Sequence, residues 1–369
     1  MEKFVRTVRG DVAPEELGFT TAHEHTLCDM TPLVEAVKEY KAMIPPEMLV
    51  WKPENAKFLR DGTALFSDDC QIGNDTEWLT AELELFRERV GGGCVVDASP
   101  ISLRGDVEKM RQVSEQTGVH IVVCTGLYYK DGRAPQYREL TVQQNYELFR
   151  KEIDEGIDGT GIRPGFLKCG FNADAKNGMQ LSPCEWETLE ALSQLSAETG
   201  MSLHVHSGPG MSAEQIIRIA DFALSHGVKP NRLNMMHLDQ YVRTPYDLSA
   251  YIRDMDTAIN VDVKLHRTIL DKGCYIGFDA WNSTVSILPN DADRLKALIE
   301  LLRSGYGSQI VLGHDTSSKA YGLTFGNVGF CGFADSCCMQ LWNYADLIDP
   351  DDIDKLTTDN PQNLLAIGG

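Results

Sequence analysis

The chain alternates between short apolar segments and amphipathic segments eight times, and this alternation is the strongest constraint on its fold. The apolar segments are rich in β-branched residues and many end in a polar residue, which is typical of buried strands. The predicted strands are residues 18–25, 93–99, 119–126, 163–169, 201–207, 232–237, 273–279 and 309–315. Strands that alternate with helices form parallel βαβ units. Eight such units predict an α/β protein with a (β/α)8 barrel, the TIM-barrel architecture, rather than a doubly wound sheet.

The segments between the predicted strands have helical patterns. Residues 107–118, 183–200 and 292–305 carry apolar side chains three or four positions apart, and each ends at a glycine. Glycine is preferred just beyond a helix because it adopts the left-handed conformation without strain. Ser182 and Asp291 are the predicted N-caps of the last two helices.

The largest departure from the regular alternation lies between the first two predicted strands. Residues 26–92 contain many charges and several prolines, among them Pro45, Pro46 and Pro53. We interpret them as an insertion with its own helices, which forms a pocket wall or a subunit contact. The sequence has no repeat or linker, so we expect one domain over residues 1–369.

Composition restricts the partners. The chain has 34 Lys and Arg against 54 Asp and Glu, a net charge of −20. This charge disfavours nucleic acids and anionic membranes.

No apolar run approaches the ~18 residues of a membrane span. The first residues lack the apolar core of a secretory signal. Several of the ten cysteines lie in apolar runs, as buried thiols do in a reducing compartment. We therefore expect a cytoplasmic protein with a small-molecule substrate. The spacing of Cys331, Cys337 and Cys338 is not that of a zinc knuckle.

Metal-binding residue types gather at the ends of the predicted strands. Six of the nine histidines lie there, together with a lysine and an aspartate: His23, His25, His204, His206, His237, His314, Lys168 and Asp315. In a barrel, catalytic groups cluster at these carboxyl ends. Strand residues two apart point to the same side, so both imidazoles of each His-x-His pair can enter the barrel mouth.

Each of these residues alone has an ordinary structural interpretation. A single histidine at a strand end is usually a hydrogen-bonding group, and a lysine there extends its amine to water. The convergence of five strands on one rim favours a metal site instead. Imidazole and carboxylate ligands without a thiolate suit zinc, manganese, cobalt or iron. Spacing alone leaves His204 and His206 as alternatives, and likewise His314 and Asp315.

The chain resembles the phosphotriesterase family of the amidohydrolase superfamily, which includes phosphotriesterase-like lactonases. The resemblance covers nearly the whole chain outside residues 26–92. The segments that carry it are TTAHEH, DVEKMRQVSEQTGVHIVVCTGLYY, RPGFLKCG, SLHVHSG, NMMHLDQ, YIGFD, GYGSQIVLGHD and DNPQNLLAIGG. The resemblance implies an amidohydrolase-type barrel with two divalent metal ions about 3.5–4 Å apart, as in other two-metal sites.

The resemblance also implies which residues bind each metal ion. His23 and His25 would bind the more buried ion together with Asp315. His206 and His237 would bind the more exposed one, with zinc as the first expectation for both and manganese, cobalt or iron as alternatives. Lys168 would bridge the ions as an N-carboxylated lysine, because a cationic amine is a poor neighbour for two cations whereas a carbamate offers two anionic oxygens.

The family pattern favours one residue in each of the two pairs that spacing left open. The ligand stands immediately before the Ser-Gly turn, which favours His206 and leaves His204 one layer deeper as a core or hydrogen-bonding residue. The carboxylate of Asp315 fits the pattern better than His314. Asp315 would also be the catalytic residue, taking a proton from the metal-bridging hydroxide and passing it to the leaving group.

Three residues are candidates for substrate binding. Tyr128 resembles the tyrosine that lactone-hydrolysing members place beside the bridging hydroxide, although an aromatic residue of the rim is an equal interpretation. Asp279 ends the seventh strand and is expected to face the pocket. Lactonase members tend to have an arginine after this aspartate, whereas this chain has Ala280, which weakens the acyl-homoserine lactonase interpretation. Trp281 is predicted to form an apolar wall.

The leading hypothesis is a dinuclear metal-dependent hydrolase in which the bridging hydroxide attacks the C=O of a lactone, ester or amide. Phosphotriester hydrolysis is expected as a side activity, or alternatively as the main one. A TatD-like nuclease and a non-catalytic ligand-binding protein are further alternatives. Lys168 and the negative charge argue against the nuclease, and the complete ligand set argues against the binding protein. A homodimer is expected.

Overall fold

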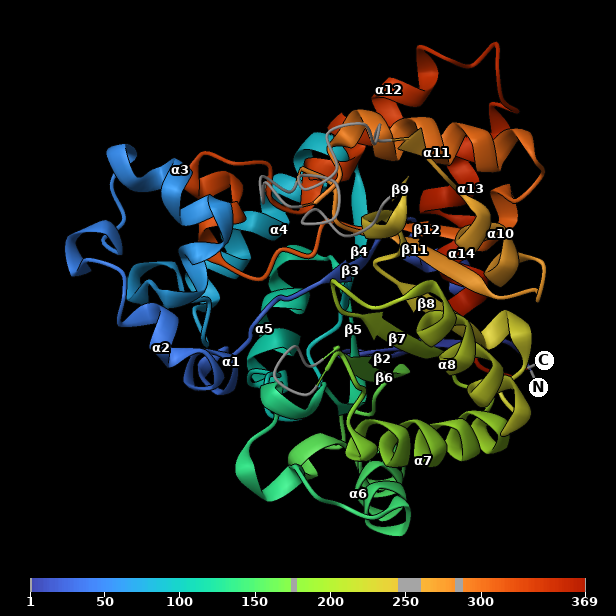
Figure 1. Ribbon diagram of the computed structural model, residues 1–369, viewed down its shortest axis with the longest axis horizontal. Helices are drawn as coiled ribbons and strands as arrows, with labels where there is room; N and C mark the ends of the chain where they lie inside the picture. The colour runs from blue at the N-terminus through green and yellow to red at the C-terminus, as the bar shows by residue number, and fades with distance from the viewer. Residues whose placement is uncertain (1, 174–177, 245–259, 283–287, 369) are drawn as a thin grey trace.

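Eight parallel strands form the central sheet of the computed structural model, which describes residues 2–173, 178–244, 260–282 and 288–368 (Figure 1). Their order in the sheet follows the chain: β3 (Phe19–Glu24), β4 (Gly92–Asp97), β5 (His120–Leu127), β6 (Phe166–Phe171), β7 (Leu203–Ser207), β8 (Leu233–Met236), β11 (Tyr275–Phe278) and β12 (Ile310–Leu312). The last strand returns to the first, where the Asp315 amide donates to the His23 carbonyl at 3.0 Å. The sheet is therefore a nearly closed barrel, and the predicted (β/α)8 fold is confirmed.

Helices cover the outside of the barrel between successive strands (Figure 1). They are α4 (Thr76–Val90), α5 (Val107–Thr117), α6 (Val142–Glu155), α7 (Pro183–Thr199), α8 (Ala213–Ser225), α10 (Lys264–Leu270), α11 (Asp291–Arg303), α13 (Asp351–Thr357) and α14 (Asp359–Leu365). The predicted helices 107–118, 183–200 and 292–305 are α5, α7 and α11.

Two of these helix starts show why local sequence sets the boundaries. Ser182 caps α7 in a reciprocal arrangement with Glu185, as predicted. The predicted cap of α11 is wrong by one residue, because Asn290 accepts the Asp293 amide at 3.0 Å and Asp291 is already helical. Asn and Asp are equally good caps, so two neighbours of these types compete for the position.

A short hairpin at the start of the chain closes the bottom of the barrel. It pairs β1 (Val5–Thr7) with β2 (Gly10–Val12) in antiparallel register, and the Val8 amide donates to the Ile121 carbonyl at 2.9 Å. Val5 and Leu17 belong to the same buried apolar cluster as the inward-facing residues of β4 and β5. The hairpin and the first residues after it therefore pack on an apolar part of the barrel interior.

The segment after β3 contains short helices, as predicted: α1 (Thr31–Ala36), α2 (Lys38–Lys41) and α3 (Ala56–Phe58). Its last part is different, since α4 packs against α5 and β4 as a regular barrel helix. The insertion itself therefore covers residues 26–75. It packs against the loop after β12: Arg60 Nε donates to the Ala320 carbonyl at 3.0 Å and Ser318 Oγ donates to the Cys70 carbonyl at 2.9 Å. Figure 1 shows the two segments side by side, in blue and orange.

The remaining regular elements are small. β9 (Arg243–Thr244) and β10 (Asn260–Val261) form an antiparallel pair, and α12 (Met339–Trp342) precedes α13. Across the described residues, no helix combines the length and the apolar composition that crossing a membrane requires.

Candidate metal centre

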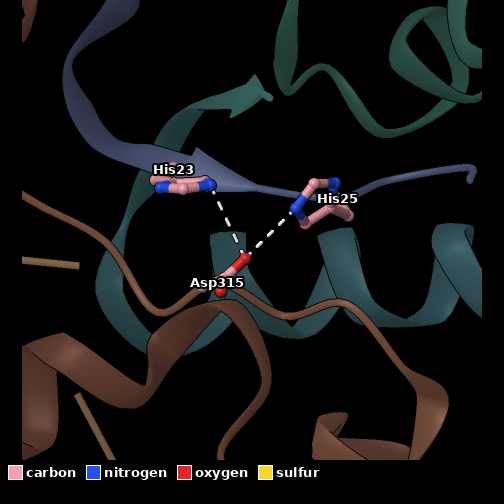
Figure 2. A group of neighbouring side chains, drawn as sticks. All are labelled: His23, His25 and Asp315. Carbon is pink, nitrogen blue, oxygen red and sulfur yellow. Dashed lines mark ion pairs between the residues drawn. The ribbon is translucent and has the colours of Figure 1, made fainter. Parts of the chain in front are cut away.

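The first strand brings two imidazoles to one carboxylate at the barrel mouth. His23 lies on β3 and His25 directly follows it, while Asp315 comes from the loop after β12 (Figure 2). Asp315 Oδ1 lies 3.5 Å from His23 Nε2 and 3.1 Å from His25 Nε2. Two ligands at ~2.1 Å from a zinc ion in tetrahedral geometry are about 3.4 Å apart. The three side chains therefore fit a shared metal ion.

A second group joins the first through Asp279, at the end of β11. Its Oδ2 lies 2.8 Å from His23 Nδ1, and its Oδ1 lies 2.8 Å from His237 Nδ1 and accepts the His237 amide at 2.9 Å. His23, His237 and Asp279 are fully buried. The contact of Asp279 with Nδ1 of both rings leaves both Nε2 atoms available to a metal ion. A carboxylate in this position fixes the orientation of metal-binding imidazoles.

His25 has the same arrangement with a different partner. Its Nδ1 lies 2.7 Å from Ser99 Oγ, at the end of β4. Its Nε2 faces Asp315. Three imidazoles of the site thus have Nδ1 beside an oxygen, which leaves Nε2 as the atom that could bind a metal ion.

His206 completes the group of imidazoles from the other side. Its ring centroid lies 4.5 Å from that of His237, and its two ring nitrogens lie 3.1 and 3.2 Å from the Tyr128 hydroxyl. His204 lies deeper in the barrel, where its Nε2 is 3.1 Å from Ser202 Oγ and its ring is 4.5 Å from that of Phe166. The structure therefore places His206, and not His204, beside the other imidazoles.

Lys168 lies in the barrel interior on β6. Its side chain is buried, and its amine donates to Met236 Sδ at 2.9 Å. Burial lowers the pKa of Lys168, so the neutral amine is favoured more than in water. A neutral amine is the form that adds carbon dioxide, and a methionine sulfur is only a weak hydrogen-bond acceptor. These properties fit a lysine that carries a carboxylate when metal ions are bound.

Two site residues adopt a left-handed backbone conformation. His237 has φ of 61° and directly follows β8, and Asp315 has φ of 58° in the loop that follows β12. This conformation is unfavourable for residues other than glycine and persists where the surroundings enforce it. His314 precedes Asp315, and its Nδ1 makes a short contact with the Trp281 carbonyl. Asp315 is thus the residue of this pair that contacts the imidazoles.

The electrostatics of the site favour the neutral form of two of its imidazoles, those of His23 and His206. Burial, reinforced by Lys168, lowers the pKa of His23 to about 3. Burial and the neighbouring His237 lower the pKa of His206. Neutral imidazoles are the form that ligates metals. Burial raises the pKa of Tyr128, so its hydroxyl keeps its proton and is available as a donor.

Two of the residues predicted to bind substrate, Trp281 and Asp279, contact other protein groups. Trp281 is fully covered by protein, and its indole Nε1 donates to the Phe278 carbonyl at 3.0 Å. A covered side chain offers no surface to a substrate, so this placement argues against the predicted apolar wall. Both carboxylate oxygens of Asp279 are occupied by contacts with Nδ1 of His23 and of His237. The hydroxyl of Tyr128, in contrast, lies at the site, 3.1 Å from His206 Nε2.

Sequence reasoning missed the partners of the imidazoles. Ser99 and Asp279 have no local signal for contacting them, since Asp279 is 256 positions from His23. Glu24, between His23 and His25 in the chain, was also missed: its buried carboxylate accepts two backbone amides of the loop that carries Asp315.

Comparison with known proteins places the chain in a family. A model of the phosphotriesterase family matches residues 3–365. The N-acetyltaurine hydrolase of Xenopus tropicalis is 26% identical over 376 residues, which are 98% of this chain and 97% of that protein.

Solved structures agree with this fold. A lactonase from Listeria monocytogenes superposes with a TM-score of 0.74 at 21% identity, covering 99% of this chain and all of that one. A doubly substituted organophosphorus hydrolase from Deinococcus radiodurans superposes with a TM-score of 0.72 at 25% identity, covering 98% and 96%. The family model spans nearly the entire sequence, and the chain therefore belongs to the phosphotriesterase family.

Proposed function

We propose that the chain is a dinuclear metal-dependent hydrolase that cleaves a carboxylic amide, ester or lactone. The observation that carries the proposal is the contact of one carboxylate oxygen of Asp315 with Nε2 of both His23 and His25. Membership of the phosphotriesterase family and the hydrolases among its relatives support the reaction class. The family membership also favours a hydrolase of this kind over a TatD-like nuclease or a non-catalytic binding protein.

The proposed ligands form two groups. His23, His25 and Asp315 would hold one divalent ion, and His206 and His237 the other. Lys168, carboxylated on Nζ, would bridge the two. Zinc is the first expectation, with manganese, cobalt or iron as alternatives. Bound ions would polarise the substrate carbonyl or phosphoryl oxygen and lower the pKa of the attacking water.

The side chains of this chain then have distinct tasks. Asp315 accepts the proton of the attacking water and delivers it to the leaving group. Asp279 and Ser99 keep the imidazoles in place through their Nδ1 atoms. The Tyr128 hydroxyl, at hydrogen-bonding distance from His206, donates to the oxygen of the substrate that gains charge.

An amide is the substrate to test first, because curated relatives over the whole chain are named N-acetyltaurine hydrolases. Phosphotriester hydrolysis is the second candidate, favoured by the 25% identity to an organophosphorus hydrolase. We also propose a cytoplasmic homodimer; the ten free cysteines, nine of them buried, support the reducing location.

The test is a substrate panel on protein reconstituted with zinc and bicarbonate. It contains N-acyl amides including N-acetyltaurine, lactones, aryl esters and a phosphotriester. We expect turnover of at least one carbonyl substrate, and a loss on the order of 10²–10⁴-fold in Asp315→Asn at saturating metal, since the amide cannot accept the proton. Activity confined to the phosphotriester would contradict the carbonyl assignment. Wild-type turnover by Asp315→Asn would contradict the proton transfer.

A further inference from the structure

Glu24, the last residue of β3, lies between His23 and His25 in the chain and makes a set of contacts that the proposed reaction does not use. Its side chain is fully buried. Oε1 accepts the His314 amide at 3.0 Å and lies 2.5 Å from Thr21 Oγ1, while Oε2 accepts the Thr316 amide at 2.8 Å. Because strand neighbours point to opposite sides, this carboxylate leaves the metal centre and reaches the loop behind it.

The two amides that Glu24 binds flank Asp315 in the chain. The amide of Asp315 itself donates to the His23 carbonyl at 3.0 Å. Three consecutive amides of the loop are thus bound by β3, two by the Glu24 carboxylate and one by the backbone. In between, Asp315 has its left-handed φ of 58°. A conformation of this kind persists only where neighbouring contacts enforce it.

We propose that Glu24 is the positioning residue that fixes Asp315 against His23 and His25. Glu24 would then align the Asp315 carboxylate with His23 and His25, the two residues on either side of Glu24 in the chain. The geometry of Asp315 does not depend on the reaction, and only the expected effects on metal retention and on turnover rest on the proposed function.

The substitution Glu24→Gln tests this role with little change of volume. The glutamine amide retains one acceptor oxygen, but its NH₂ group faces a backbone N–H that it cannot bind. One of the two flanking amides therefore loses its partner, whichever way the side chain is turned. Thr21→Val, which removes the hydroxyl beside Oε1, is the milder second variant and covers the case in which Glu24→Gln fails to fold.

The same loop supplies a matched control. Glu82 on α4 is also buried, and its carboxylate accepts the amides of Leu323 at 2.9 Å and Thr324 at 2.8 Å and the Thr324 hydroxyl at 2.7 Å. Glu82→Gln thus breaks contacts of the same chemistry, seven or more residues further along the loop. A general loss of loop stability would appear in both variants.

Amide hydrogen exchange followed by mass spectrometry gives the direct readout, and it needs no substrate. In Glu24→Gln, peptides covering residues 312–318 exchange at least tenfold faster than in the wild type, while those covering 321–326 change little. In Glu82→Gln the pattern is reversed. Thr21→Val shows a smaller acceleration in 312–318. Unchanged exchange of 312–318 in Glu24→Gln, or equal acceleration of both regions in both variants, overturns the proposal.

Metal retention and a double substitution link this position to the site. We expect zinc-reconstituted Glu24→Gln to lose metal to a chelator about 10–100-fold more readily than Glu82→Gln, the range found for residues that orient metal ligands.

With saturating zinc, Glu24→Gln lowers kcat at nearly constant KM, and it has little further effect in an Asp315→Asn background. Full additivity with Asp315→Asn overturns the proposed route through Asp315. A protein that is inactive on every substrate contradicts the proposed function, while the exchange experiment still decides the role of Glu24.

Discussion

At the scale of single residues, Asp279 contacts two imidazoles of the candidate metal centre at once. Each of its oxygens lies 2.8 Å from an Nδ1 atom, one of His23 and one of His237. The adjacent histidines hold the pKa of Asp279 well below its usual range even though burial opposes this. An ionised carboxylate therefore links His23, a proposed ligand of the first metal ion, to His237, a proposed ligand of the second.

Replacing this carboxylate weakens metal binding more than it weakens the fold. In Asp279→Asn the amide retains one acceptor, so one imidazole loses the partner that orients it. We expect the zinc dissociation constant to rise about 10–100-fold, as for comparable residues around metal ligands. Competition with a chromophoric chelator measures it, and circular dichroism checks that the barrel is intact. An unchanged zinc affinity would show that the imidazoles are oriented without Asp279.

The two histidines of β7 have opposite expected roles. His206 lies beside His237 and Tyr128, whereas His204 packs on Phe166 one layer deeper. We predict that His206→Ala loses bound zinc and that His204→Ala retains it with a lower melting temperature. Metal analysis of both purified variants distinguishes them. Equal metal loss in both, or loss in His204→Ala alone, is incompatible with this assignment.

At the scale of elements, α10 is linked to the site by a buried histidine. His266 is fully buried, and its Nε2 lies 2.7 Å from the carbonyl of Leu238, the residue after His237. Burial lowers the pKa of His266 from 6.5 to about 4. The unfolded chain therefore binds a proton near pH 6.5, and the folded protein resists it until about pH 4.

This difference predicts a loss of stability in acid. Above pH 6.5 His266 is neutral in both states and costs no stability. As the pH falls from 6.5 toward 4, the folded protein loses up to about 3 kcal/mol of stability relative to the unfolded chain, which gains the proton. His266→Gln keeps a donor for the Leu238 carbonyl but does not titrate. The free energy of unfolding, measured with urea between pH 4 and 7.5, should fall more steeply in the wild type than in this variant. Parallel curves would exclude His266 as the cause.

The sequence predicted the elements whose signals are local. Eight strands and three helices follow from apolar periodicity and from caps such as Ser182, and all are observed. The hairpin of β1 and β2 was missed because each strand has three residues, too few for a period to appear. The extent of the insertion was overestimated, although Asp75 and Gly91, the N-cap and C-cap of α4, mark a regular helix within it.

At the scale of the whole molecule, the barrel explains which site residues could be predicted. Residues at strand ends meet because the strands are parallel. The proposed ligands could therefore be chosen from the sequence: His23, His25, His206, His237, Lys168 and Asp315. Their supporting contacts could not. The partner of a side chain such as Asp279 depends on packing between segments more than 200 positions apart, and a sequence contains no local signal for it.

The insertion gives the molecule one more long-range connection. Trp51 packs on Phe325 with ring centroids 4.8 Å apart, and Lys319 Nζ lies 2.5 Å from Asp75 Oδ2. Through these contacts, residues 26–75 support the loop that begins at Asp315. The predicted role as a pocket wall or a subunit contact stays a prediction, but its contact with this loop is evident (Figure 1).

The central claim is that the barrel mouth binds two metal ions per chain. Metal analysis of the purified protein, after reconstitution with zinc and bicarbonate and removal of free metal, tests it most directly. The imidazoles, the carboxylate of Asp315 and the buried Lys168 predict close to two zinc ions per chain. A value of one or none after this treatment would contradict the dinuclear site.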